Sequence, residues 1–376
     1  MAIDTRKVAK KVAERTLDLA FRYGQDDLDK VSDARRWYDW DWYMGVAFYG
    51  LWKAHELLEN DAYVLRIKQW IDQRIEAGIQ MVCVNTCAPM TTVLRLHQLY
   101  PDERYEALCQ TFDDYILNQA PRTPSGIMAH TVIGRDFVGQ VWADTLFMSI
   151  IYLTQRGLYL NSQAHLEEAA RQRVFHLDSL YDEKDGLFYH GWDDVAKKPL
   201  GVKWGRGNAW IIVSMMEMLE SLPLDAPERT AHLEKLNNQM AALEEHQDSN
   251  GCWRTVLDHH DTYPETSVTA GVAAGALKGI RLGLIDDRYE EMAQKAIQAL
   301  VAKIDDEGNV LGGSSGTAIK KSVAEYNDVP LAVTPFTQGL ALMALCEATT
   351  FASLSAGLAG SASASVGAPI QHTNST

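Results

Sequence analysis

The residue with the clearest capacity for acid/base chemistry is an aspartate next to aromatic side chains. Asp144 stands in the segment QVWADTLFM (140–148), and the residues after it are mostly apolar. Burial beside Trp142 and Phe147 would raise the pKa of this carboxyl, whereas a position at the start of a helix would lower it. The sequence leaves open which effect is larger. It also leaves open whether Asp144 is an acid/base group or a helix-capping aspartate.

A second segment combines an arginine with tryptophans. In KWGRGNAW (203–210), glycines flank Arg206, and Trp204 and Trp210 lie on either side of it. Glycine lets the backbone approach a ligand closely, and the guanidinium fork suits a carboxylate. We therefore expect Arg206 to bind a charged ligand rather than to hold the fold. The segment lacks the Gly-x-x-x-x-Gly-Lys pattern of a phosphate-binding loop.

Aromatic residues are densest in RWYDWDWYMG (36–45), which includes Trp42. Flat apolar rings with polar edges suit the stacking of sugar rings, although some of these residues could simply fill the core. A metal site is not expected. His259 and His260 are adjacent and therefore point apart, and the five scattered cysteines form no zinc-binding pattern.

Two kinds of helical segment alternate along the chain and must position these residues. A helix that is apolar on all sides has to be buried on all sides, whereas an amphipathic helix covers a core from outside. The amphipathic segments are 5–23, 61–78, 103–119, 162–178, 228–246 and 287–304, and the apolar ones are 43–58, 88–100, 141–156, 208–221, 268–282 and 338–349. This alternation predicts an all-α toroid of six inner helices ringed by six outer ones.

The long connections of this toroid lead from outer to inner helices and so emerge at one end. They comprise residues 24–42, 120–140, 179–207, 247–267 and 305–337, whereas 79–87 is short. Long loops in a compact domain usually carry function. We therefore expect one catalytic domain over residues 1–352 with an aromatic funnel at this end. A repeat scaffold for protein binding fits less well, because solenoid repeats are more regular in length.

Composition narrows the partners and the compartment. The 376 residues carry 35 Lys and Arg against 50 Asp and Glu, a net charge of −15, which disfavours nucleic acid and anionic membrane surfaces. We see no signal peptide, no membrane helix and no disulfide framework, so we expect a cytoplasmic protein. Residues 353–376 are rich in Ser, Ala and Gly and are predicted to form a flexible tail. The oligomeric state is not determined by the sequence.

The segments WADTLFM (142–148) and WGRGNAW (204–210) resemble glycoside hydrolase family 105, the unsaturated rhamnogalacturonyl hydrolases. These enzymes are close relatives of the family 88 unsaturated glucuronyl hydrolases. The resemblance spans residues 5–350, and it extends to WDWYMG (40–45), to NGCW (250–253) with ETS (265–267), and to GLAL (339–342). It implies an (α/α)6 barrel, in agreement with the helix count obtained from the apolar pattern.

The resemblance also implies roles for individual residues. Asp144 matches the catalytic acid/base of the family, and Trp42 matches an aromatic residue that stacks on the unsaturated ring. The other positions that match substrate-binding residues are Trp204, Arg206, Trp210, His130 and His190. Asn85 marks a departure: relatives place a second aspartate there, and an amide can bind hydroxyl groups but cannot act as a carboxylate. The identity of the sugar is therefore open.

The implied reaction consumes a C4=C5 double bond left by a polysaccharide lyase. Asp144, held protonated near the working pH, would donate its proton to C4 while water adds at C5, and the aglycone would leave together with a 4-deoxy-5-keto uronate. No metal, cofactor or covalent intermediate is required. Such an enzyme would complete the degradation of pectin or a related polysaccharide by acting on unsaturated uronyl oligosaccharides.

Three alternatives share the toroid. An inverting glycosidase would need a second carboxylate, such as Asp41 or Glu265, across the scissile bond. A sugar epimerase would rely on a histidine pair, for which His130 and His190 are candidates. A noncatalytic carbohydrate-binding toroid would keep the tryptophans and tolerate the loss of Asp144.

Overall fold

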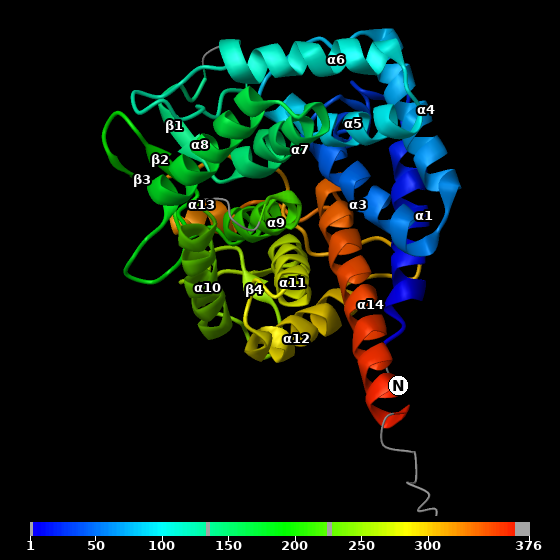
Figure 1. The fold of residues 1–376 in the computed structure, drawn as a ribbon, viewed down its shortest axis with the longest axis vertical. Coiled ribbons are helices and arrows are strands. Elements are labelled where there is room, and N and C mark those ends of the chain that lie inside the picture. Colours follow the sequence, from blue (N-terminus) through cyan, green and yellow to red (C-terminus); the bar gives the residue numbers. More distant parts are fainter. Residues whose placement is uncertain (1–2, 133–135, 224–227, 365–376) are drawn as a thin grey trace, which may run out of the picture.

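The computed structural model describes residues 3–132, 136–223 and 228–364, and in these ranges an inner and an outer ring of helices alternate along the chain (Figure 1). The inner helices contact one another in sequence, and the last of them packs against the first, so the ring closes. The inner helices are α3 (Trp42–Leu58), α5 (Met90–Leu99), α7 (Ile151–Leu160), α9 (Gly205–Ser221), α11 (Thr266–Arg281) and α14 (Pro335–Ala364). The outer helices are α1 (Thr5–Ala20), α4 (Asp61–Ala77), α6 (Glu103–Asp114), α8 (Gln163–Leu180), α10 (Arg229–Glu245) and α12 (Glu290–Val301). The predicted all-α (α/α)6 fold is confirmed.

Burial explains the two rings. Every residue of α9 from Gly205 to Leu219 is buried, because the helix packs against neighbours on all sides. The outer helix α4 instead buries one stripe at helical spacing, which consists of Tyr63, Val64, Ile67, Trp70 and Ile71. This is the difference between all-round apolar and amphipathic segments on which the sequence prediction depended.

Short elements fill the connections between the helices. Three strands form one antiparallel sheet in the order β1-β2-β3: β1 (Gln140–Trp142), β2 (Gly191–Asp193) and β3 (Lys198–Leu200). A second pair joins β4 (Trp253–Arg254) to β5 (Pro264–Glu265). The remaining short helical elements are η1 (Gln25–Asp27), α2 (Ala34–Tyr38), η2 (Asn85–Cys87), η3 (Tyr115–Gln119), η4 (Leu146–Ile150), η5 (Asp287–Tyr289) and α13 (Val323–Asn327). These strands are too short to give a pattern in the sequence.

The C-terminal segment begins as a continuation of the last inner helix, and its flexibility stays a prediction. Helix α14 continues to Ala364, well into the segment 353–376 that we predicted to be a flexible tail, and its end reaches past the other helices in Figure 1. Alanine and leucine are strong helix formers, so a segment without an apolar period can still be helical. The rest of the predicted tail, 365–376, lies outside the described residues.

The inner ring closes through a close helix crossing. A Cβ atom on Gly50 would lie 2.3 Å from the carbonyl oxygen of Gly339, and a Cβ on Gly339 would lie 2.3 Å from the carbonyl oxygen of Val46. Helices α3 and α14 therefore meet backbone to backbone. Any side chain at either glycine would force the two helices apart.

We expect Gly339→Ala to destabilise the protein by about 1–3 kcal/mol, the usual cost of overpacking a core. Chemical denaturation of both proteins measures this difference in the free energy of unfolding. Gly24→Ala is the matched control, because the nearest atom to an added Cβ there is the Asp27 carboxylate at 3.8 Å. Equal stability of the two variants would contradict the close crossing.

Candidate active site

A small sheet brings Asp144 and His190 together. Strand β1 ends two residues before Asp144, strand β2 begins directly after His190, and the register pairs Trp142 with Gly191. The backbone N–H of Ala143 also donates to the carbonyl oxygen of His190, at 3.0 Å. As a result, Oδ2 of Asp144 lies 3.4 Å from Nε2 of His190. Both atoms are buried, and within the described part of the chain each faces the other rather than a further hydrogen-bond partner.

Two buried histidines flank this carboxylate, each against a tryptophan. The ring of His130 lies parallel to that of Trp142, with the centroids 4.3 Å apart, and the ring of His190 stacks on Trp204 at 4.0 Å. Burial lowers the pKa of His130 to about 4 and also lowers the pKa of His190. Both imidazoles are therefore neutral at pH 7.

The charge of Asp144 follows from several opposing effects. The residue is 8% exposed. This burial raises its pKa, but His190, His130 and Arg206 together outweigh burial and hold the pKa below its ordinary value. The carboxyl is therefore an anion in the free protein. The sequence left the direction of this pKa shift open, and in the free protein the shift is downward.

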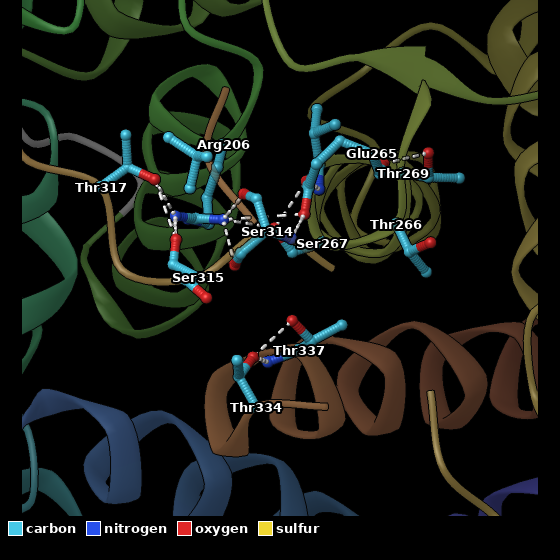
Figure 2. Close-up of polar contacts among 12 residues, drawn as sticks. Arg206, Glu265, Thr266, Ser267, Thr269, Ser314, Ser315, Thr317, Thr334 and Thr337 are labelled. Carbon is cyan, nitrogen blue, oxygen red and sulfur yellow. Dashed lines mark hydrogen bonds and ion pairs between the residues drawn. The ribbon is translucent and has the colours of Figure 1, made fainter. Parts of the chain in front are cut away.

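Arg206 makes its contacts within the protein (Figure 2). Its Nη1 donates to Oγ and the carbonyl oxygen of Ser314 and to Oγ of Ser267, and its Nη2 donates to the carbonyl oxygen of Ser315 and to Oγ1 of Thr317. Arg206 thus ties the segment 314–317 to the start of α9. Direct binding of a substrate by Arg206 stays a prediction.

The glycines around Arg206 also serve packing. A Cβ atom on Gly205 would lie 2.5 Å from the carbonyl oxygen of Arg254, and one on Gly207 would lie 3.1 Å from the ring of Trp204. These glycines allow α9 to begin against neighbouring chain segments. The sequence prediction had assigned this close approach to a ligand instead.

Glu265 is occupied by structural contacts. Its Oε2 accepts hydrogen bonds from the backbone N–H of Val268 and from Ser267 Oγ, which caps helix α11. Its Oε1 accepts from the backbone N–H of Ser314 at 2.6 Å and lies 3.6 Å from Nη1 of Arg206. Figure 2 shows the pair between the two inner helices. A carboxylate bound in this way is not free to activate a water molecule.

Asp41 caps helix α3 by accepting the backbone N–H of Trp42 at 2.8 Å. Burial raises the pKa of this carboxyl to about 6. Trp42 itself is 9% exposed, and its ring contacts those of Tyr43, at 4.2 Å, and Phe336, at 4.7 Å. Trp42 therefore begins an inner helix at the same end of the barrel as Asp144.

The two other predicted tryptophans lie deeper. Trp210 is fully buried, with its ring 5.0 Å from that of Phe147 and 6.3 Å from that of Trp42. Trp204 is buried beneath His190. Both tryptophans support residues of the site, and of the three predicted tryptophans Trp42 is the most exposed.

Asn85 lies half-buried at the start of η2. The preceding residue, Val84, donates its N–H to the carbonyl oxygen of Thr131 at 3.3 Å, and its own carbonyl oxygen accepts Oγ of Ser149 at 3.2 Å. Thr131 follows His130, and Ser149 belongs to η4, the π-helical turn that begins two residues after Asp144. These bonds hold Asn85 at the end of the barrel where the histidines lie.

The family model of Glycosyl Hydrolase Family 88 matches residues 16–352. The chain belongs to glycosyl hydrolase family 88. The family 88 chain is 34% identical over 312 residues to the unsaturated rhamnogalacturonyl hydrolase YesR of Bacillus subtilis, covering 82% of this chain and 89% of YesR. The resemblance found in the sequence is confirmed, and the protein is a glycosidase.

Two solved structures extend this likeness. Both are described as possible members of the GH105 family. The one from Salmonella enterica superimposes with a TM-score of 0.86 at 30% identity, covering 92% of this chain and 94% of the other. The one from Klebsiella pneumoniae gives a TM-score of 0.85 at 29% identity, covering 92% and 93%.

Two aromatic residues of this candidate site were not singled out from the sequence. Tyr326 lies in α13 and contacts His190, and Phe336 stacks on Trp42 from the start of α14. Both belong to parts of the chain that are distant in sequence from their partners. The segment GGSSG (312–316) was an available signal, because it contributes Ser314 and Ser315 to the Arg206 cluster.

The described ranges of this family 88 protein hold no group of three or more His, Cys, Asp or Glu residues arranged to bind a metal ion. His259 lies 3.8 Å from the carboxylate of its neighbour Asp261, on an exposed loop. Within the same ranges, no helix is both long enough and apolar enough to span a membrane.

Proposed function

We propose that this family 88 glycosidase hydrates the C4=C5 double bond of unsaturated uronyl oligosaccharides, with 4,5-unsaturated galacturonyl-rhamnose as the leading candidate substrate. The observation that carries the proposal is the buried Asp144 carboxylate between two neutral imidazoles. The relative YesR, an unsaturated rhamnogalacturonyl hydrolase, supports the same substrate class. Both carboxylate oxygens of Glu265 already accept hydrogen bonds within the protein. This argues against the alternative of an inverting glycosidase that uses Glu265 as its second carboxylate.

Binding of the substrate would cause Asp144 to become protonated. A uronate carboxylate bound near Asp144 adds a like charge and removes water, and both effects raise the pKa of Asp144. Protonated Asp144 then donates its proton to C4, and water attacks C5. The attacking water keeps one proton as the new C5 hydroxyl group and gives the other to Asp144, so the acid is regenerated.

The product of this addition is a hemiketal at C5. Cleavage of the bond between C5 and the ring oxygen gives the C5 ketone and leaves a hemiacetal at C1. Loss of the aglycone alcohol from C1 then gives the aldehyde of a 4-deoxy-5-keto uronate. One water molecule is consumed, and no metal or cofactor takes part in this scheme.

The other residues would bind and orient the sugar. Trp42 offers a ring face for stacking, and the Asn85 amide offers hydrogen bonds to hydroxyl groups. His130 and His190 lie beside the Asp144 carboxylate. Trp204 packs against His190, and Trp210 packs against Trp42. Arg206 keeps the segment 314–317 in place. We assign these roles to the binding of the unsaturated ring rather than to proton transfer.

We expect kcat/KM and kcat to depend differently on pH. An acid must be protonated to act, so the rate falls as pH rises through its pKa. Since kcat/KM reports the free enzyme, where the pKa of Asp144 is lowered, kcat/KM should already fall across the neutral range. Because kcat reports the substrate complex, its fall should begin at higher pH. Steady-state rates at a series of pH values measure both, and coincident limbs would contradict the proposed rise in pKa.

A panel of lyase-generated disaccharides tests the substrate class. The panel should include unsaturated galacturonyl-rhamnose, an unsaturated glucuronyl-hexosamine and a sulfated analogue, followed by the ultraviolet absorbance of the conjugated alkene. We expect absorbance to be lost fastest with galacturonyl-rhamnose. Binding without any turnover would favour the noncatalytic toroid.

We also propose that the enzyme works in the cytoplasm. All five cysteines are free and buried, as expected for a protein of a reducing compartment. Fractionation of the producing cells, with activity on unsaturated disaccharides assayed in each fraction, tests this. Recovery of the activity outside the cells would contradict the proposal.

A further inference from the structure

A tyrosine of the last long connection reaches into the site from behind His190. Tyr326 belongs to α13 and is fully buried, and its Oη lies 2.6 Å from Nδ1 of His190. The site makes room for this contact at Gly201, whose φ is +74°, because a Cβ there would lie 2.5 Å from the tyrosine Oη. The contact between Tyr326 and His190 therefore depends on three positions of the chain, the third being Gly201.

The direction of the hydrogen bond follows from the other partner of the phenol. The backbone N–H of Lys320 donates to Oη of Tyr326 at 3.3 Å, and among the described residues Nδ1 of His190 is the acceptor that lies within reach of the hydroxyl proton. Burial raises the pKa of Tyr326, so the phenol keeps this proton. Because the imidazole is neutral, an Nδ1 atom that accepts a hydrogen bond leaves the ring proton on Nε2.

The protonated Nε2 then faces the catalytic carboxylate, since it lies 3.4 Å from Oδ2 of Asp144. We infer that Tyr326 is a positioning residue that fixes the tautomer of His190, so that an N–H and not a lone pair meets Asp144. This inference rests on the proposed function for its catalytic meaning. An N–H at this point stabilises the Asp144 anion that remains after proton donation to C4 and keeps His190 from taking the proton.

The charged and titratable groups around the pair are few. His190 faces Asp144, Tyr326 and Arg206, and Asp144 faces His190, His130 and Arg206. Of these groups, Tyr326 is the one that hydrogen-bonds Nδ1 of His190. Removing its hydroxyl therefore changes the tautomer preference and leaves the other charges in place.

The direct test is nitrogen NMR of the free protein labelled with ¹⁵N-histidine, with His190→Gln used to assign the signals. In the wild type we expect the Nε2–H tautomer of His190. In Tyr326→Phe we expect a mixture of tautomers. Wild-type His190 in the Nδ1–H form, or an unchanged Nε2–H form in Tyr326→Phe, would overturn the inference. A wild-type Nδ1–H form overturns the inference even if the variant does not fold.

Kinetics give the second readout. One hydrogen bond has a modest net value, so Tyr326→Phe should lower kcat by about three- to tenfold. The alkaline limb of kcat/KM should move to higher pH, because a lone pair facing Asp144 disfavours its anion. A loss of kcat with an unchanged limb would assign Tyr326 a merely structural role.

Tyr263→Phe is the matched control. Its hydroxyl donates to the carbonyl oxygens of Val329 and Tyr326, at 3.3 and 3.5 Å, and so anchors the same segment without a hydrogen bond to His190. We expect neither the tautomer nor the pH limb to change in this variant. Because the NMR test needs no substrate, failure of the proposed function and failure of this inference remain distinguishable.

Discussion

Asp144→Asn is expected to lower turnover of unsaturated disaccharides by about 10²–10⁴-fold, the range of a general acid/base, and toward the upper end because one group serves both roles. The amide is nearly isosteric with the carboxyl and still forms hydrogen bonds, so the variant should fold and bind substrate. It cannot donate an acidic proton to C4 or remove one from water. Loss of alkene absorbance measures turnover, and calorimetry measures binding.

Asp102→Asn is the control for this variant. Asp102 caps the outer helix α6 by accepting the backbone N–H of Arg104 at 2.8 Å, and it contacts no residue of the site. If Asp144 were only a helix cap, both variants would keep near wild-type rates. Retention of more than about a tenth of turnover by Asp144→Asn, well outside the range for an acid/base group, would place the acid elsewhere.

Arg206 gives the second large effect, and here the structure changes the expectation drawn from the sequence. Arg206→Lys should destabilise the protein by about 1–3 kcal/mol or more, the cost of leaving a buried acceptor without its donor. A lysine has one terminal nitrogen and cannot satisfy the carbonyl and hydroxyl groups of 314–317 together with Glu265. The sequence alone had predicted that Arg206 binds a charged ligand and does not hold the fold.

Denaturant unfolding and turnover per folded molecule separate the two roles of Arg206. A double variant, Arg206→Met with Glu265→Leu, removes both charges and should recover part of the stability that Arg206→Met loses. If Arg206→Lys unfolds like the wild type and loses turnover, Arg206 binds the substrate directly, as the sequence predicted.

The helices could be predicted because the spacing of apolar residues shows which faces of a helix are buried. Segments such as 208–221 and 61–78 differ in how many of their faces are apolar, and this difference places one inside the ring and the other outside. The end of the barrel at which the candidate residues gather could also be predicted, since the long connections had to emerge together. Asp144 and Trp42 lie at the starts of inner helices for this reason.

What could not be predicted depends on partners that are distant in sequence. A guanidinium fork serves a ligand carboxylate and protein carbonyls equally well, so nothing near Arg206 indicated that Ser314 and Ser315 occupy it. The lowered pKa of Asp144 likewise requires His190 and Arg206 from other segments. Tyr326 gave no local signal at all, because its role exists only through the folded contact with His190.

Hydration of the double bond is the central claim, and the reaction in deuterium oxide tests it most directly. If Asp144 delivers a solvent-derived proton to C4, proton and carbon NMR of the product will show one deuterium at C4 of the 4-deoxy-5-keto uronate. The alkene signal and its absorbance will disappear in step with release of the aglycone. Release of the aglycone with the C4=C5 bond intact and no deuterium at C4 would contradict the account and identify an ordinary glycosidase.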